Sequence, residues 1–247
     1  MQKPSASKCV AFIPARSGSK RLADKNIRPL LGHPLMAYSI TSALDSGIFS
    51  RVVVSTDSLR YAEIAAYYGA DVLMRPPQMA QDTSPDIEWV LHALDVVPCE
   101  VYAILRPTSP FRKPETIQRA WEEFRVGPYD SLRAVEKCRE HPAKQWVLRN
   151  GILHPLLPLV EGSTGAPGHS SQYPSLPAVY VQNASLEMAW AEMTKKFKSI
   201  AGEVIHGFLT FGEEGRDINS LYDWQIAEAM VAAGEATLPE VKIPAIQ

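Results

Sequence analysis

The stretch that most constrains the fold is an apolar run that ends abruptly in a basic loop. The run Cys9–Pro14 shows no polar alternation, which is typical of a strand buried on both faces of a sheet. The loop after it places several cations around Ser17-Gly18-Ser19: Arg16, Lys20, Arg21 and, beyond the first acid Asp24, Lys25. Backbone N–H groups and cations at a strand end favour a polyanion such as a triphosphate. The stretch therefore predicts a nucleotide-using enzyme; the alternative is a solvated basic loop.

Two well-known phosphate-binding loops do not fit these residues. A Walker A loop requires Gly-Lys-Ser/Thr, whereas Lys20 follows Ser19 and precedes Arg21. A dinucleotide-binding loop requires Gly-x-Gly-x-x-Gly, and Gly18 is the single glycine of this loop. A phosphate-binding role would therefore need a loop of another kind, and a solvated basic loop stays the alternative.

Composition restricts the classes of function further. The chain has 247 residues, enough for one sizeable domain. Its net charge of −2 and pI of about 6.3 lack the basic excess of a nucleic-acid-binding domain. The 3 cysteines form no Cys-x-x-Cys, which argues against a disulfide framework or zinc site. The start, Met1-Gln2-Lys3-Pro4-Ser5, lacks a signal-peptide core, and no apolar run approaches membrane-spanning length. We therefore expect a soluble cytoplasmic protein that binds neither nucleic acid nor membrane.

Strand and helix signals alternate over the first half of the chain. Strands are expected at Cys9–Pro14, Arg51–Ser55, Asp71–Met74 and Val101–Leu105. Helices are expected to begin at Pro34, after Ser58, at Pro85 with Ser84 as its N-cap, and at Pro114. This alternation predicts an α/β fold, a three-layer α/β/α sandwich with a mostly parallel sheet. Ligands of such sheets lie at the carboxyl ends of the strands, which here carry polar segments.

The character of the sequence changes at about residue 140. Asn150-Gly151, between two short apolar runs, is a strong hairpin signal. A long loop without periodicity follows, with Pro155, Pro158, Gly162, Gly165, Pro167, Gly168, Pro174 and Pro177. Loops of this length are usually functional or disordered. We expect a protruding arm over about residues 140–177 that forms a symmetric homodimer.

The remaining chain is expected to return to the main body. It returns through Ala178 to Trp190, and a short basic helix near Lys195-Lys196 and a strand around Val204 follow. A final helix carries Leu221 and Trp224 and ends at Gly234.

Short segments in a fixed order relate the chain to a known family. They are Ile13–Arg21 with Lys25-Asn26, Val54–Asp57, Arg75-Pro76 followed by Asp82-Thr83, Pro107–Arg112, and Asp217-Ile218-Asn219. Together they make the chain resemble the acylneuraminate cytidylyltransferases over nearly its whole length. The resemblance implies one nucleotidyltransferase domain over residues 1–247, with a nucleotide-diphospho-sugar transferase-like fold. It also implies that a sugar-acid hydroxyl attacks the α-phosphorus of CTP, which yields a CMP conjugate and pyrophosphate.

The resemblance also implies where the nucleotide binds. Arg16, Lys20 and Lys25 would hold the triphosphate and stabilise the departing pyrophosphate, a task of positioning and charge neutralisation. The other expected nucleotide contacts are Ala15, Ser17, Gly18, Asn26, Arg75 and Ser84. For Lys25 and Arg75 the alternative is a surface ion pair. For Ser84 the alternative is a helix cap alone.

The family uses Mg²⁺, held near the last helix by an Asp-x-Asp motif, and Mn²⁺ is a second candidate. Here the motif reads Asp217-Ile218-Asn219. Asn219 offers an oxygen without charge, so metal binding should weaken or shift toward Asp217 and phosphate oxygens. Asn219 as a cap of the final helix is the alternative.

The expected acceptor site departs most from the family. Its residues by resemblance are Arg106, Thr108, Tyr180, Gln182 and Asn183. Sialic-acid enzymes have glutamine where this chain has Arg106, which could clamp an anionic group or form an internal ion pair. The family's arginine-rich segment and Tyr-Arg-x-Asn-Gly are replaced by Ser171-Gln172 and Tyr180-Val181-Gln182-Asn183-Ala184. We therefore expect a legionaminate-like or other 3-deoxy sugar acid.

Other functions stay open on the sequence alone. A nucleotidyltransferase acting on a sugar phosphate or phosphonate fits Arg106 and the missing arginines. A non-catalytic nucleotide-binding homologue is supported only by Asn219. A glycosyltransferase is disfavoured because no Asp-x-Asp follows the middle strand.

Overall fold

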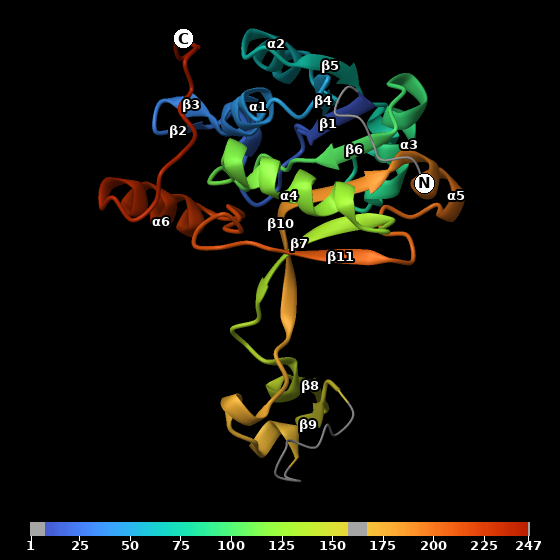
Figure 1. Ribbon diagram of the computed structural model, residues 1–247. Coiled ribbons are helices and arrows are strands. Elements are labelled where there is room, and N and C mark those ends of the chain that lie inside the picture. The colour runs from blue at the N-terminus through green and yellow to red at the C-terminus, as the bar shows by residue number, and fades with distance from the viewer. Residues whose placement is uncertain (1–7, 158–166, 247) are drawn as a thin grey trace. The chain divides into compact units, whose positions relative to one another are not determined.

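A computed structural model describes residues 8–157 and 167–246 (Figure 1). The chain divides into two compact units, a smaller one over Val135–Gln182 and a larger one formed by the residues on either side. The expectations for Met1–Ser5 and for Pro158, Gly162 and Gly165 lie outside the described residues. One domain with an arm over residues 140–177 stays a prediction.

The larger unit is built on a seven-stranded sheet in the order β11-β7-β10-β6-β1-β4-β5. The strands are β1 (Cys9–Pro14), β4 (Arg51–Thr56), β5 (Asp71–Met74), β6 (Val101–Ile104), β7 (Ser131–Lys137), β10 (Tyr180–Trp190) and β11 (Ile205–Leu209). Neighbouring pairs among β6, β1, β4 and β5 are parallel, whereas β10 runs antiparallel to β6. The sheet is therefore mixed and mostly parallel, as predicted.

Helices cover both faces of this sheet (Figure 1). Alternate residues of β1 explain why: Ala11 and Ile13 enter one buried cluster, and Val10 and Phe12 enter another. The first cluster packs against α1 (Leu35–Asp45), α2 (Leu59–Tyr67) and α4 (Pro114–Val126). The second packs against α3 (Asp86–Val96) and α5 (Ala191–Phe197). The predicted three-layer α/β/α sandwich is confirmed.

The last helix joins the larger unit beside α1. α6 (Leu221–Ala232) buries Trp224 and Ala227 in a third cluster with Leu35 and Tyr38. The short strands β2 (Pro29–Leu30) and β3 (His33–Pro34) pair across a turn with positive φ at Leu31 and Gly32. Within the described residues, no helix combines the length and the apolar character that a membrane span requires.

Two predicted helix starts are displaced. Pro34 is the N-cap of α1 and not its first residue. α3 begins at Asp86 with Pro85 as its N-cap, and the Ser84 hydroxyl donates to the Gln78 carbonyl at 2.9 Å. Ser84 therefore lies one residue too early to cap α3, and the prediction that it does so is wrong.

The smaller unit contains the predicted hairpin. β8 (Trp146–Arg149) pairs antiparallel with β9 (Ile152–Pro155), and Asn150 and Gly151 take the positive φ values that such a turn requires. Short 3-10 helices fill much of the rest: η4 (Pro142–Lys144), η5 (Gly168–Ser170) and η6 (Tyr173–Ser175). Leu148 and its cross-strand partner Leu153 remain 67% and 56% exposed.

Candidate functional site

A cavity of about 300 Å³ lies at the carboxyl ends of the central strands. Its lining residues come from strand ends, loops and helices far apart in the sequence: Pro14, Arg16, Ser19, Lys25, Asn26, Arg75, Asp86, Trp89, Arg106, Pro107, Thr108, Ala184, Asp217 and Asn219. Pro14 ends β1, and Arg106 follows β6, the strand on the opposite side of β1 from β4. The order of the strands reverses between β1 and β6, which is where open α/β sheets bind ligands.

The basic loop after β1 is anchored by carboxylates. Asp57 accepts hydrogen bonds from the Ser17 N–H at 2.8 Å and from the Ser17 hydroxyl at 2.9 Å. Asp82 contacts the Arg16 guanidinium at 2.5 Å and the Lys20 ammonium at 2.6 Å. Hydrogen bonds from Lys20 and Arg16 hold the pKa of Asp82 below its ordinary value. One carboxylate therefore offsets part of the positive charge of Arg16 and Lys20, which we expect to bind phosphate.

Lys25 and Asn26 follow in η2 (Lys25–Ile27) and connect this loop to the end of the chain. The Lys25 ammonium donates to the Ile218 carbonyl at 3.1 Å and to Asn219 Oδ1 at 3.3 Å. Burial lowers the pKa of Lys25, against the opposing charge of Asp217. Asn26 is buried and donates to the Arg16 carbonyl at 3.1 Å. Lys25 therefore belongs to the cavity, and the alternative of a surface ion pair is wrong.

Asp217 and Asn219 form the other wall, directly before α6. Asn219 Nδ2 donates to Asp217 Oδ2, while Asp217 Oδ1 is buried without a hydrogen-bond partner in the described part of the chain. The cap of α6 is Ser220, whose hydroxyl accepts from the Asp223 N–H at 3.2 Å in a capping box. The alternative that Asn219 caps this helix is therefore wrong.

Arg75 lines the cavity beside Trp89. Its guanidinium is 4.8 Å from the centre of the Trp89 ring and donates to the Ser55 hydroxyl at 3.2 Å. Arg75 is only 5% exposed, so the alternative of a surface ion pair is wrong for this residue too. Burial lowers the pKa of Arg75 to about 10.

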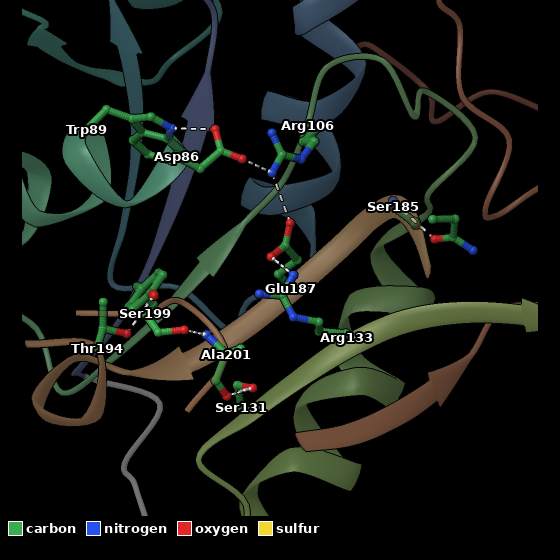
Figure 2. Close-up of polar contacts among 12 residues, drawn as sticks. Asp86, Trp89, Arg106, Ser131, Arg133, Ser185, Glu187, Thr194, Ser199 and Ala201 are labelled. Carbon is green, nitrogen blue, oxygen red and sulfur yellow. Dashed lines mark hydrogen bonds and ion pairs between the residues drawn. The ribbon is translucent and has the colours of Figure 1, made fainter. Parts of the chain in front are cut away.

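Arg106 lines the cavity and also forms internal ion pairs (Figure 2). Its Nη2 is 2.5 Å from Asp86 Oδ2 and 3.0 Å from Glu187 Oε1. Although burial opposes it, the Glu187 and Asp86 carboxylates raise the pKa of Arg106, so the guanidinium stays charged. Thr108 lies two residues further on, and its carbonyl accepts from the Ile218 N–H at 2.8 Å. That bond joins the segment after Arg106 to the Asp217 segment.

Several predicted contacts lie outside the cavity lining. Ala15, Ser17 and Gly18 flank Arg16 in the sequence but do not line the cavity. The exposed Lys20 side chain contacts Asp82, and the Ser84 hydroxyl donates to the Gln78 carbonyl. Asn183 donates to the Thr210 hydroxyl at 2.8 Å. Tyr180 and Gln182 are exposed residues of the smaller unit. The binding roles of all these residues stay predictions.

The sequence interpretation missed Asp86, Trp89 and Ala184, which line the cavity. Asp86 Oδ1 accepts from the Trp89 indole N–H at 2.9 Å, and both residues lie on one side of α3. Their i, i+3 spacing makes them neighbours on α3. The apolar residues of this helix dominate its sequence pattern, so the interpretation did not single these two out. Ala184 carries no side-chain chemistry that a sequence could signal.

Comparison with known proteins decides the family. The cytidylyltransferase family model matches residues 10–147 of the 247-residue chain. The chain belongs to the cytidylyltransferase family. This confirms the resemblance on which the site prediction rests, and the cavity is the candidate active site of a cytidylyltransferase.

Individual relatives agree with this assignment. The N-acylneuraminate cytidylyltransferase of Escherichia coli is 50% identical over 107 residues, 43% of this chain but only 26% of the relative. The CMP-N,N'-diacetyllegionaminic acid synthase of Legionella pneumophila is 33% identical over 244 residues, 93% of this chain and 98% of the relative. This cytidylyltransferase thus spans about a quarter of one relative and nearly all of the other.

A solved structure supports the fold. CMP:2-keto-3-deoxy-manno-octonic acid synthetase in complex with CTP superposes with a TM-score of 0.68 over 92% of this chain and 99% of that one. The sequence identity is 14%. The cytidylyltransferase therefore shares the fold of that enzyme.

Proposed function

We propose that this cytidylyltransferase transfers CMP from CTP to the hydroxyl of an acidic sugar and releases pyrophosphate. The observation that carries the proposal is that Arg16, Lys25 and Asp217 line the same cavity as Arg75 and Arg106. The cations Arg16 and Lys25 suit a triphosphate, and Arg106 suits a separate anionic group. A CTP complex of a protein with this fold supports the choice of nucleotide.

The proposed step is an in-line displacement. The acceptor hydroxyl forms a bond to the α-phosphorus as the bond to the β-phosphate oxygen breaks, and the hydroxyl proton leaves to solvent. We assign the departing pyrophosphate to Arg16 and Lys25, which line the cavity, and to Lys20, which contacts Asp82 outside the lining. Fixed cations in a partly buried site stabilise such a charge better than water does. Asn26 and Arg75 are the proposed nucleoside contacts.

A divalent cation, Mg²⁺ or alternatively Mn²⁺, fits part of this site. Asp217 Oδ1 is buried without a partner among the described residues, which suits a hard cation. Asn219 Oδ1 already accepts from Lys25 at 3.3 Å and Arg21 at 3.1 Å. Within residues 8–157 and 167–246, no group of three or more His, Cys, Asp and Glu could hold a metal. We therefore propose Asp217 as the protein ligand, with CTP oxygens completing the coordination, and the cation would neutralise phosphate charge.

Arg106 is the basis for proposing an acid as the acceptor. The relatives are named for an N-acylneuraminate and a legionaminic acid, both acids. A legionaminate-like or other 3-deoxy sugar acid is our first choice for this chain. A sugar phosphate or a phosphonate is the second choice, because Arg106 would bind those anions equally well.

The proposal is tested by pyrophosphate release with each of the four nucleoside triphosphates and Mg²⁺ or Mn²⁺. The acceptors are sialic, legionaminic, pseudaminic and 3-deoxy-octulosonic acids and a set of sugar phosphates. Turnover with CTP and one sugar acid is expected. Turnover only with a sugar phosphate would replace the acceptor class, and CTP binding without any turnover would favour a non-catalytic homologue.

A further inference from the structure

Glu187 is a buried carboxylate held between two guanidinium groups (Figure 2). It lies in β10 opposite Ile104 of β6 and is 4% exposed. Glu187 Oε1 accepts from Arg106 Nη2 at 3.0 Å, and Glu187 Oε2 accepts from Arg133 Nη1 at 2.5 Å. A charge at such a position is costly unless it is fully paired. Both oxygens are paired here, so this carboxylate has a defined position.

Arg106 is held on one side only. Its Nη2 is shared by Asp86 and Glu187, whereas its Nε and Nη1 form no hydrogen bond within the described residues. Of the described residues in this network, Arg106 and Asp86 line the cavity but Glu187 does not. Glu187 is therefore placed to act on the position of a ligand through Arg106 and not by contact.

The two carboxylates hold Arg106 toward different elements. Asp86 is at the start of α3 and is fixed in turn by Trp89, while Glu187 is fixed in β10 by Arg133 of β7. Without Glu187, Asp86 alone would direct the guanidinium toward α3 and Trp89. The position of the unbonded nitrogens thus depends on Glu187.

We infer that Glu187, fixed by Arg133, is a positioning residue that sets where Arg106 meets the anionic group of the acceptor. This inference rests on the proposed function. It assigns acceptor recognition to a pair, Arg106 and Glu187, and leaves the triphosphate side of the cavity unaffected.

The variant Glu187→Gln tests the inference, because it removes the charge and keeps the size of the side chain. With the best acid acceptor, we expect the acceptor KM to rise about tenfold or more, with the CTP KM unchanged. In an Arg106→Gln background, Glu187→Gln should have no further effect on the acceptor KM. If Glu187→Gln does not fold, Arg133→Lys should raise the acceptor KM in the same selective way.

Glu214→Gln is the matched control. Glu214 accepts from Arg119 at 2.9 Å and Thr116 at 2.7 Å, outside the cavity lining, so its loss should lower the thermal midpoint and leave both KM values unchanged. Equal changes in acceptor and CTP KM for Glu187→Gln, or additive effects with Arg106→Gln, would overturn the inference while the proposed function stands. A wild-type enzyme that uses no acid acceptor would overturn the proposed function and, with it, this inference.

Discussion

At the scale of single residues, Lys25 is a cation of the cavity lining that we propose as a triphosphate contact. Lys25→Ala should lower kcat/KM for CTP by about a hundredfold or more, because a preorganised cation is lost where charge develops. Thermal melting should change little. Lys113→Ala, an exposed lysine outside the cavity lining, is the control and should keep full activity. An active Lys25→Ala enzyme would show that the triphosphate is bound elsewhere.

Because Lys25 is titratable, we expect CTP affinity to depend on pH. Burial lowers the pKa of Lys25, so its ammonium loses its proton at a lower pH than an exposed lysine does. CTP affinity should therefore be full below that lowered pKa and fall as the pH rises through it. Lys25→Arg should move the alkaline limb to higher pH, measured by titration calorimetry. An unmoved limb would assign it to another group.

Substitution of Asn219 tests whether a divalent cation binds at Asp217. Asn219→Asp exchanges its amide hydrogen bond to Asp217 for a second carboxylate, so a divalent cation would relieve the repulsion between the two. The Mg²⁺ concentration for half-maximal activity should fall. In EDTA, the thermal midpoint of Asn219→Asp should drop below that of the wild type and recover with Mg²⁺. A midpoint indifferent to Mg²⁺ would argue against a cation at Asp217.

At the scale of elements, the start of α6 determines how the Asp217 segment is held. Ser220→Ala should lower the free energy of unfolding by about 1 kcal/mol, because the capping hydroxyl is lost. Activity should fall as well, since Asp217 and Asn219 precede this cap. Ser58→Ala removes the cap of α2 at a position outside the cavity lining and should reduce only stability. Urea unfolding and pyrophosphate release measure the two effects. If Ser220→Ala were as active as Ser58→Ala, the α6 cap would have no influence on the site.

The elements also show what a sequence can predict. β1 and β4 were predictable because uninterrupted apolar runs signal strands buried on both faces. β7 was missed because its residues, Ser-Leu-Arg-Ala-Val-Glu-Lys, include charges, one of which is Arg133 in the buried pair with Glu187. That pair joins residues 54 positions apart, so no local pattern reveals it. Arg16 and Lys25 were predictable from the basic loop, whereas Asp86 and Trp89 enter the cavity lining through the packing of α3, which their i, i+3 spacing alone does not reveal.

At the scale of the whole molecule, the exposed apolar residues of the smaller unit support the proposed homodimer. Leu148 and Leu153 face the same side of the β8–β9 hairpin and are more than half exposed. Light scattering should give twice the chain mass of 27.3 kDa. The double variant Leu148→Glu/Leu153→Glu should be monomeric, and Leu59→Glu, an exposed leucine of α2, should remain a dimer. A monomeric wild type would contradict the proposal.

The central claim for the whole molecule is that CMP is joined to an acidic sugar. The most direct measurement is ³¹P NMR of the enzyme with CTP, Mg²⁺ and the best acid acceptor. We predict one new phosphodiester signal, from a CMP conjugate, that grows in equal amount with pyrophosphate as the CTP signals decline. Pyrophosphate with free CMP, or CTP signals that persist with every acid, would contradict the account.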